Sequence, residues 1–364
     1  MIYRILFYFA NIVIRIYYRK IHVTGLESIP KNKPLIIVSN HPNGFLEPII
    51  MACLFPIELH FLVRGDLFEK KALRWLLTST NQVPIYRFKD GIAALRNNQK
   101  TIAKTLEVLN RNKAIIIFAE GSTDSSWFLR EFKKGMARMA FQCLDENPNL
   151  DLQILPVGVV FQKSSSPGTE VMLNVGEAFA VNPYYVKNAR EAKDKMDALT
   201  LDTYNKIKKL VIHIEDDSHT SLVHKAWKLY SSRHHDWFLP RVTHDQDIFS
   251  YVKKSISSSN EVPPLKNGKY FILNLFSFIL GIPGFIFWIL PVYFGEKITK
   301  QFVKEEEFVS SIKASSTAGL CVIYSIVLLI PMIYFLGISK AFLLLIAFSI
   351  SGIFMLAAWE YKQC

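Results

Sequence analysis

The sequence predicts an α/β protein with a mainly parallel, twisted sheet flanked by helices, an N-terminal interfacial helix and a C-terminal transmembrane helical region. Between about residues 20 and 180, short runs rich in β-branched residues alternate with longer helical patterns, which is typical of a parallel sheet covered by helices. Three apolar stretches, at 270–295, 314–339 and 341–359, contain no Asp, Glu, Lys or Arg. Each approaches or exceeds the roughly 20 residues that a helix needs to cross a bilayer.

The first 20 residues are predicted to form an interfacial membrane helix. This segment is apolar, but Arg4 and Arg15 leave an uncharged run of only ten residues between them, which is too short to span a bilayer. A helix lying in the membrane surface, with both arginines extended toward the headgroups, fits this pattern. No small-residue cleavage site follows, so we do not expect a signal peptide.

Residues 21–212 are predicted to form the α/β domain. We expect strands at 35–38, 60–63, 82–86, 114–118, 152–159 and 171–175, and helices at 48–54, 68–79, 91–110, 135–144 and 187–212. Ligand sites in such sheets lie beyond the carboxyl ends of the strands. Because His41, Arg87 and Glu120 each follow one of these strands, we expect them to converge on one edge.

Residues 213–269 differ in character and are predicted to form a polar helical connector followed by a linker. The segment is rich in histidine and aspartate, but the spacings match no familiar set of metal ligands, so we expect no metal site. The serines, prolines and glycine of 255–269 are typical of a linker. The chain's four cysteines show no paired spacing, which argues against a disulfide framework.

Residues 270–364 are predicted to form a membrane domain with two or three spans. The first apolar stretch contains Pro283 and Gly284, so it is either one kinked span or a re-entrant hairpin. The loop that follows holds Lys297 and Lys300, among other lysines, and the preference of basic loops for the cytoplasm favours the re-entrant alternative. Three full crossings would place the same loop on the other side.

The net charge of +12 is consistent with a protein that lies on an anionic membrane leaflet. Nucleic acid is the rival partner for a basic protein, but no recognised nucleic-acid motif accompanies the charge. A transporter is also disfavoured, because the apolar stretches contain no ionisable residue to mark a pathway. We therefore expect a lipid bilayer, and no nucleic acid, as the partner.

The segment 39–48, Ser-Asn-His-Pro-Asn-Gly-Phe-Leu-Glu-Pro, is the main candidate for a catalytic site. His41 follows an apolar strand, and the next residues break regular structure, so the histidine is expected on a sharp turn at the end of that strand. Glu47 follows across the same turn. A histidine held by a carboxylate is suited to removing a proton from a hydroxyl group near neutral pH.

Four blocks of sequence resemble the glycerolipid acyltransferase superfamily, which includes the glycerol-3-phosphate and 1-acylglycerol-3-phosphate acyltransferases. They are 39–48, Asn-Gln-Val-Pro-Ile-Tyr-Arg at 81–87, Ile-Phe-Ala-Glu-Gly-Ser at 117–122 and Ile-Leu-Pro-Val-Gly-Val at 154–159. Five residues separate His41 from Glu47, which resembles a branch of the superfamily that has the longer spacing. Glu47 stands where that branch has aspartate.

The resemblance implies a role for each matched residue. His41 would be the general base, and Glu47 would orient its ring. The acceptor would be bound by Arg87, Glu120, Gly121, Ser122 and Lys133, and Arg87 matches the position that contacts its phosphate. The chain departs from the pattern at Ala119, where proline is usual, and at Thr123, where many relatives carry arginine; Lys133 is a candidate to replace that charge.

The implied activity is the transfer of a fatty acyl group from an acyl-CoA or acyl carrier protein thioester to a hydroxyl of glycerol 3-phosphate or 1-acylglycerol 3-phosphate. No cofactor is expected besides the thioester co-substrate, and the active site is expected to face the cytoplasm. Two alternatives remain open. Thr123 is compatible with a non-phosphate lyso-aminolipid acceptor, and Glu47 with Ala119 is compatible with a catalytically silent membrane-anchored homologue.

Overall fold

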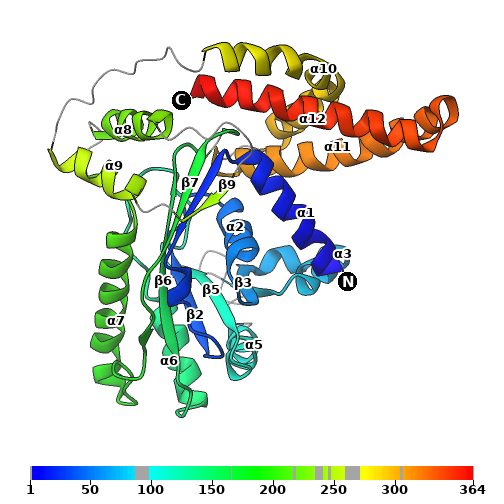
Figure 1. The fold of residues 1–364 in the computed structure, drawn as a ribbon. Helices are drawn as coiled ribbons and strands as arrows, with labels where there is room; N and C mark the ends of the chain where they lie inside the picture. The colour runs from blue at the N-terminus through cyan, green and yellow to red at the C-terminus, as the bar shows by residue number, and fades with distance from the viewer. Residues whose placement is uncertain are drawn as a thin grey trace.

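The computed structural model describes residues 2–86, 98–164, 166–215, 219–233, 241–244, 247–258, 271–303 and 306–363. Within them the sheet has nine strands in the order β4-β3-β5-β2-β6-β7-β1-β9, with β8 beside β6 (Figure 1). The strands are β1 (Lys20–Thr24), β2 (Leu35–Ser39), β3 (Leu59–Arg64), β4 (Gln82–Ile85), β5 (Ala114–Phe118), β6 (Gln153–Phe161), β7 (Glu170–Val175), β8 (Phe179–Ala180) and β9 (Arg241–Thr243).

The sheet is mainly parallel, which confirms the predicted fold class. Strands β4, β3, β5, β2 and β6 run in one direction, whereas β7 pairs antiparallel with β6, and β1 and β9 follow the direction of β7. The carboxyl ends of β2, β5 and β6 therefore share one edge of the sheet with the amino ends of β7, β1 and β9. This edge is the one at which His41 and Glu120 follow their strands.

Helices cover both faces of the sheet (Figure 1). They are α1 (Ile2–Tyr17), α2 (Leu46–Leu54), α3 (Lys71–Ser79), α5 (Asn98–Asn110), α6 (Gly135–Glu146), α7 (Ala189–Leu210), α8 (Thr220–Arg233), α9 (Asp247–Ser258), α10 (Phe271–Phe302), α11 (Glu306–Leu336) and α12 (Ile338–Gln363). In β2, Ile36 and Val38 pack with α5 to α9, whereas Leu35 and Ile37 pack with α1 and α2. The apolar run of β2 is continuous because alternate residues enter two different cores.

The segment after residue 212, expected as a connector, instead completes the α/β domain. Strand β9 pairs with β1, and the indole of Trp227 in α8 is fully buried in one of the two cores. Trp227 donates its N–H to the buried carboxylate of Glu170 at 2.7 Å, so a polar partner from β7 holds α8 in place. The polar composition of the segment concealed this role, because the burial depends on a residue far away in the sequence.

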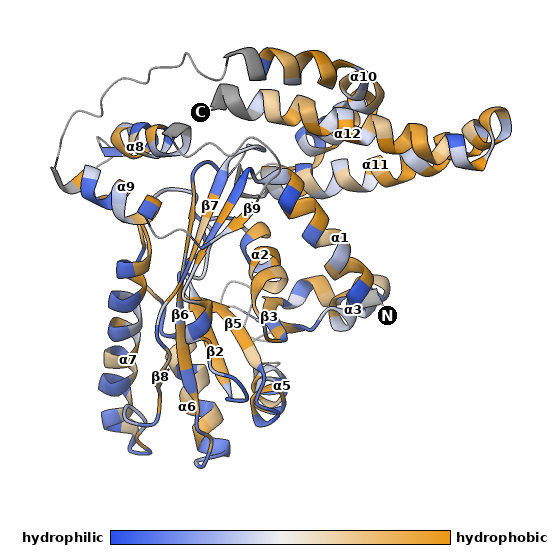
Figure 2. Cartoon of the chain, in the orientation of Figure 1, coloured by the Kyte–Doolittle hydropathy of each residue, from blue (hydrophilic) through white to orange (hydrophobic). Residues whose placement is uncertain are grey.

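Helices α10, α11 and α12 are the most apolar part of the chain (Figure 2). Three segments, Asn274–Phe302, Ser311–Leu336 and Ile338–Trp359, are long and apolar enough to cross a membrane. Helix α1 also exposes apolar side chains, although it is shorter. It packs Ile14 into the core beside the sheet and exposes Ile5, Tyr8 and Ile12 on its outer side.

Helix α10 doubles back along the hairpin that α11 and α12 form. The contacts that establish this are Gly281 with Met355, Gly284 with Gly352, Trp288 with Phe348, and Gly295 with Thr317. Met355 and Thr317 both lie toward the open end of the hairpin, away from the turn at Gly337, whereas Phe348 lies about halfway along it. Pro291 of α10 lies between Trp288, which contacts the middle of the hairpin, and Gly295, which contacts its open end. Proline is a usual cause of a sharp bend in a helix.

Candidate active site

His41 and Glu47 meet across the turn that joins β2 to α2. The Nδ1 atom of His41 lies 2.5 Å from Oε1 of Glu47, whose side chain is completely buried, while 17% of the His41 side chain is exposed. Glu47 is the second residue of α2, where the positive end of the helix dipole favours a negative charge. Because Nδ1 is engaged with the carboxylate, the imidazole presents Nε2 as the atom available to a substrate.

The ring of His41 is fixed from a second direction by β5. It stacks on Phe118 with the ring centroids 4.1 Å apart and the planes 14° from parallel. The loops that follow β2 and β5 are also joined by backbone hydrogen bonds, from Ala119 N–H to the Ser39 carbonyl at 3.2 Å and from Asp124 N–H to the His41 carbonyl at 3.0 Å. The parallel pairing of β2 with β5 therefore places these two sequence blocks together.

Glu120 lies beside the His41–Glu47 pair and forms an ion pair with Arg130. Arg130 donates to Oε2 of Glu120 from Nε at 3.2 Å and from Nη2 at 2.8 Å, and to the hydroxyl of Ser122 at 2.9 Å. Burial raises the pKa of the Glu120 carboxyl, and the charge and hydrogen bonds of Arg130 oppose this effect. Arg130 was not among the predicted site residues, because no motif marks it, and only the folding of its loop brings it to Glu120.

Of the remaining predicted site residues, the structure describes Gly121, Ser122 and Lys133 but not Arg87. Gly121 has a φ of 73°, in the left-handed region that favours glycine, and the Lys133 side chain passes over it, so that a Cβ at Gly121 would lie 2.8 Å from Lys133 Cδ. The backbone N–H of Lys133 donates to the Ala119 carbonyl at 2.9 Å. These contacts bring Gly121, Ser122 and Lys133 together around Glu120, whereas Arg87 lies outside the residues that the structure describes.

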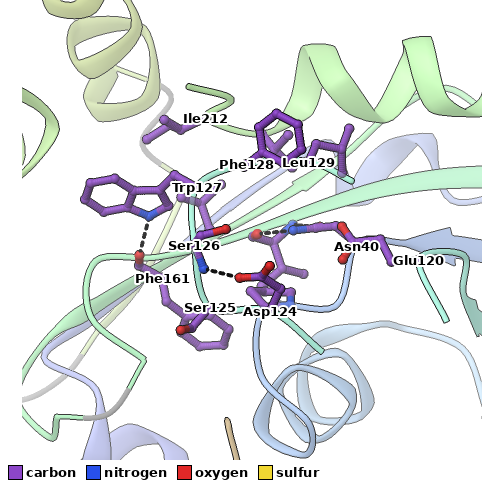
Figure 3. A pocket seen from close by; sticks show the side chains of 14 residues that line it. Asn40, Glu120, Asp124, Ser125, Ser126, Trp127, Phe128, Leu129, Phe161 and Ile212 are labelled. Atoms are coloured by element: carbon purple, nitrogen blue, oxygen red, sulfur yellow. Dashed lines mark hydrogen bonds between the residues drawn. The ribbon is translucent and has the colours of Figure 1, made fainter. Parts of the chain in front are cut away.

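A cavity adjoins the turn on the side of the loop 124–129 (Figure 3). The cavity is lined near the His41–Glu47 pair by Asn40, Pro42 and Glu120. Trp127 and Phe128 contribute apolar surface. The indole of Trp127 donates to the Phe161 carbonyl at 3.0 Å and thereby ties the loop to the end of β6. Among the residues that the structure describes, no group of histidine, cysteine or acidic side chains is arranged to hold a metal ion.

The histidine–carboxylate pair lies at the edge of a mainly parallel sheet, and comparison with known proteins shows which family this part of the chain resembles. Residues 20–160 match the family described as Acyltransferase. A 1-acyl-sn-glycerol-3-phosphate acyltransferase of Borreliella burgdorferi is 28% identical over 123 residues, which are 34% of this chain and 47% of that protein. A chloroplastic enzyme of the same name from Arabidopsis thaliana is 25% identical over 169 residues, or 46% of this chain and 43% of that protein.

The chain is therefore similar, over residues 20–160, to the glycerolipid acyltransferases. Its match spans about half the length of these two curated relatives, 47% and 43%. The crystal structure of the 1-acyl-sn-glycerophosphate acyltransferase PlsC from Thermotoga maritima aligns with a TM-score of 0.40 and 17% identity, covering 57% of this chain and 79% of that one.

The contact between His41 and Glu47 predicts the effect of shortening the acid. In Glu47→Asp, the carboxylate retracts by roughly one carbon–carbon bond from a site where it is 2.5 Å from Nδ1, and a misplacement of about 1 Å can cost about 10²-fold in rate. We expect kcat for acyl transfer to fall by about that factor in steady-state assays. A variant more active than the wild type would show instead that aspartate is the better partner and that the natural site is impaired.

Proposed function

We propose that this protein transfers a fatty acyl group from an acyl thioester to a free hydroxyl of a phosphate-bearing glycerolipid precursor at a membrane surface. The observation that carries the proposal is the 2.5 Å contact between His41 and the buried Glu47, which leaves Nε2 available at the edge of the sheet. A neutral imidazole in this position is a suitable base for a hydroxyl near pH 7.

In the proposed reaction, Nε2 of His41 removes the proton of the acceptor hydroxyl as its oxygen attacks the thioester carbonyl carbon. A C–O bond forms, the C–S bond breaks, and the departing thiolate takes the proton from the imidazolium. Glu47 holds the ring through Nδ1 and stabilises the imidazolium while it is charged. No nucleophilic serine or cysteine of the protein is needed, because the thioester is already activated.

The first-choice acceptor is 1-acylglycerol 3-phosphate, because both curated relatives described above carry that substrate in their names. The five-residue spacing between His41 and Glu47 resembles that of certain glycerol-3-phosphate acyltransferases, so glycerol 3-phosphate is the second candidate. We propose that Arg87 and Lys133 supply positive charge for the acceptor's phosphate, since a guanidinium can bind phosphate in a bidentate manner. The donor would be an acyl-CoA or an acyl carrier protein thioester.

A direct assay tests the activity. The full chain, reconstituted in vesicles, is supplied with palmitoyl-CoA or palmitoyl carrier protein and with 1-acylglycerol 3-phosphate, glycerol 3-phosphate or a lyso-aminolipid, with His41→Ala as the blank. Transfer to a phosphate-bearing acceptor above the blank supports the proposal. Transfer only to the lyso-aminolipid would replace the acceptor class, and no transfer with any pair would favour a catalytically silent homologue.

We further propose that α11 and α12 span the bilayer, that α10 enters and leaves on one side, and that the catalytic domain faces the cytoplasm on that same side. The doubling back of α10 against the hairpin supports this topology. In sealed vesicles, an impermeant maleimide should label Lys193→Cys and Lys297→Cys from the same side, and Ile338→Cys from the other, above the level of the unsubstituted chain. Labelling of Lys193→Cys and Lys297→Cys from opposite sides would indicate three full crossings instead.

A further inference from the structure

A buried hydrogen bond joins the membrane region to the catalytic turn. The hydroxyl of Ser311, near the start of α11, donates to Oδ1 of Asn43 at 2.7 Å, and Ser311 is only 1% exposed. Ala314, one turn further along α11, is buried in the same core as Ile14 of α1 and Leu46 of α2. The first turns of α11 therefore pack against the catalytic domain beside α1 (Figure 1), whereas later residues such as Ile323 are exposed.

Asn43 is the residue that organises this turn. Its Oδ1 accepts from the backbone N–H groups of Phe45 and Leu46, at 3.3 and 3.1 Å, and so satisfies donors that the start of α2 leaves without helical partners. Its own backbone N–H donates to Oε1 of Glu47 at 3.1 Å. At 2.7 Å, the hydroxyl of Ser311 is closer to Oδ1 than either of these backbone nitrogens.

The orientation of Glu47 depends strongly on this arrangement. Its Oε1 receives both His41 Nδ1 and the N–H of Asn43, whereas its buried Oε2 has no hydrogen-bond partner among the described residues. Among the residues that the structure describes, the carboxylate is thus held through Oε1. A shift of Asn43 would move the oxygen that positions the imidazole, and catalytic rates are sensitive to such shifts.

We propose that Ser311 is a positioning residue, through which the membrane helix α11 holds Asn43, and thereby Glu47 and His41, in the geometry for proton transfer. The proposal rests on the proposed acyltransferase function. The catalytic turn is correctly set only when α11 is seated against it, so the membrane region does more than anchor the domain. The chemistry of this contact requires a hydroxyl donor at position 311.

The test compares two serine-to-alanine changes on the same helix. Ser311→Ala is expected to lower kcat roughly five- to tenfold, the change that corresponds to one hydrogen bond, with KM for both substrates unchanged. Ser325→Ala is the matched control, since its hydroxyl donates to the Cys321 carbonyl within α11, and it should leave kcat unchanged. Ser311→Thr, which keeps the hydroxyl, should recover most of the loss. Equal kcat values for the two alanine variants would overturn the proposal.

Two further measurements separate positioning from general loss of structure. In a background of Glu47→Asp, where the dyad is already misaligned, Ser311→Ala should add less than about a twofold effect; a full, multiplicative effect would contradict action through Glu47. Amide hydrogen exchange of residues 43–47 should be faster in Ser311→Ala than in Ser325→Ala. This second readout needs no activity, so unchanged exchange overturns the proposal even if the wild type transfers no acyl group.

Discussion

Replacing His41 is expected to lower kcat for acyl transfer by about 10²- to 10⁴-fold, the usual contribution of a positioned general base. The reason is that Nε2 of His41 is the proposed acceptor of the hydroxyl proton, with Nδ1 already engaged by Glu47 at 2.5 Å. His41→Asn is the more informative variant, because its side-chain amide can still donate to the buried Glu47 carboxylate while it removes the base. His41→Ala also leaves that buried charge without its histidine partner, with the Asn43 N–H still bound to it, which destabilises the fold.

A variant of a second histidine tests whether the effect is specific to the base at position 41 or follows the loss of any histidine. His244 is exposed and follows β9, outside the catalytic turn, so His244→Ala should retain wild-type kcat. Far-ultraviolet circular dichroism and thermal unfolding of His41→Asn should match the wild type. If His41→Asn kept more than about a tenth of the wild-type kcat, general-base catalysis by His41 would be the wrong mechanism.

Glu170→Gln is expected to destabilise the protein by about 3–5 kcal/mol, as breaking a buried ion pair usually does. Glu170 is 1% exposed, and its two oxygens accept from Arg19 at 2.5 Å, Trp227 at 2.7 Å and Ser231 at 2.8 Å. Glutamine removes the charge that compensates the buried Arg19. In thermal unfolding of the solubilised full chain at pH 7, we expect a fall in Tm on the order of 10 °C.

The same carboxylate predicts how stability depends on pH. Burial alone would raise the pKa of Glu170, but the charge of Arg19 and the hydrogen bonds of His22 and Trp227 outweigh it and hold that pKa well below the usual range. A depressed pKa contributes stability above the pKa of the unfolded chain, about 4, and this contribution is lost as the pH falls. The Tm difference between wild type and Glu170→Gln should therefore shrink below about pH 4.

The control for Glu170 is an exposed acid in a comparable number of ion pairs. Glu107 on α5 pairs with Lys104 and Arg111 at the surface. Exposed pairs contribute little, because water and salt screen them. Glu107→Gln should thus leave Tm unchanged, and an equal change in both variants would mean that burial of Glu170 has no special energetic role.

Most of the central sheet could be predicted from sequence because its signals are local. The apolar runs at 35–38 and 114–118 form β2 and β5 as expected, since strands buried on both faces need no polar alternation. Strand β1 was not predicted. Its Lys20 and His22 are buried polar residues, and a strand with such residues becomes favourable only when partners such as Glu170 arrive from elsewhere.

In the candidate site, too, local contacts could be predicted from the sequence and long-range contacts could not. His41 and Glu47 are six positions apart, so their meeting is a local property of one turn, and the sequence predicted the pair. Arg130, Phe118 and Ser311 were not predicted to act at this site. Each reaches it through packing between segments that are distant in the chain, and no spacing rule connects them to His41.

By itself, the sequence determined the α/β class, the histidine–carboxylate pair and the three apolar helices, because strand burial, a single turn and helix length all depend on residues close together in the chain. Only the tertiary structure decided that α8 and β9 complete the domain, that α10 doubles back, and that Ser311 reaches the catalytic turn. These features arise from contacts between residues tens to hundreds of positions apart, whose free energy exists only once the whole sheet and its helices have assembled.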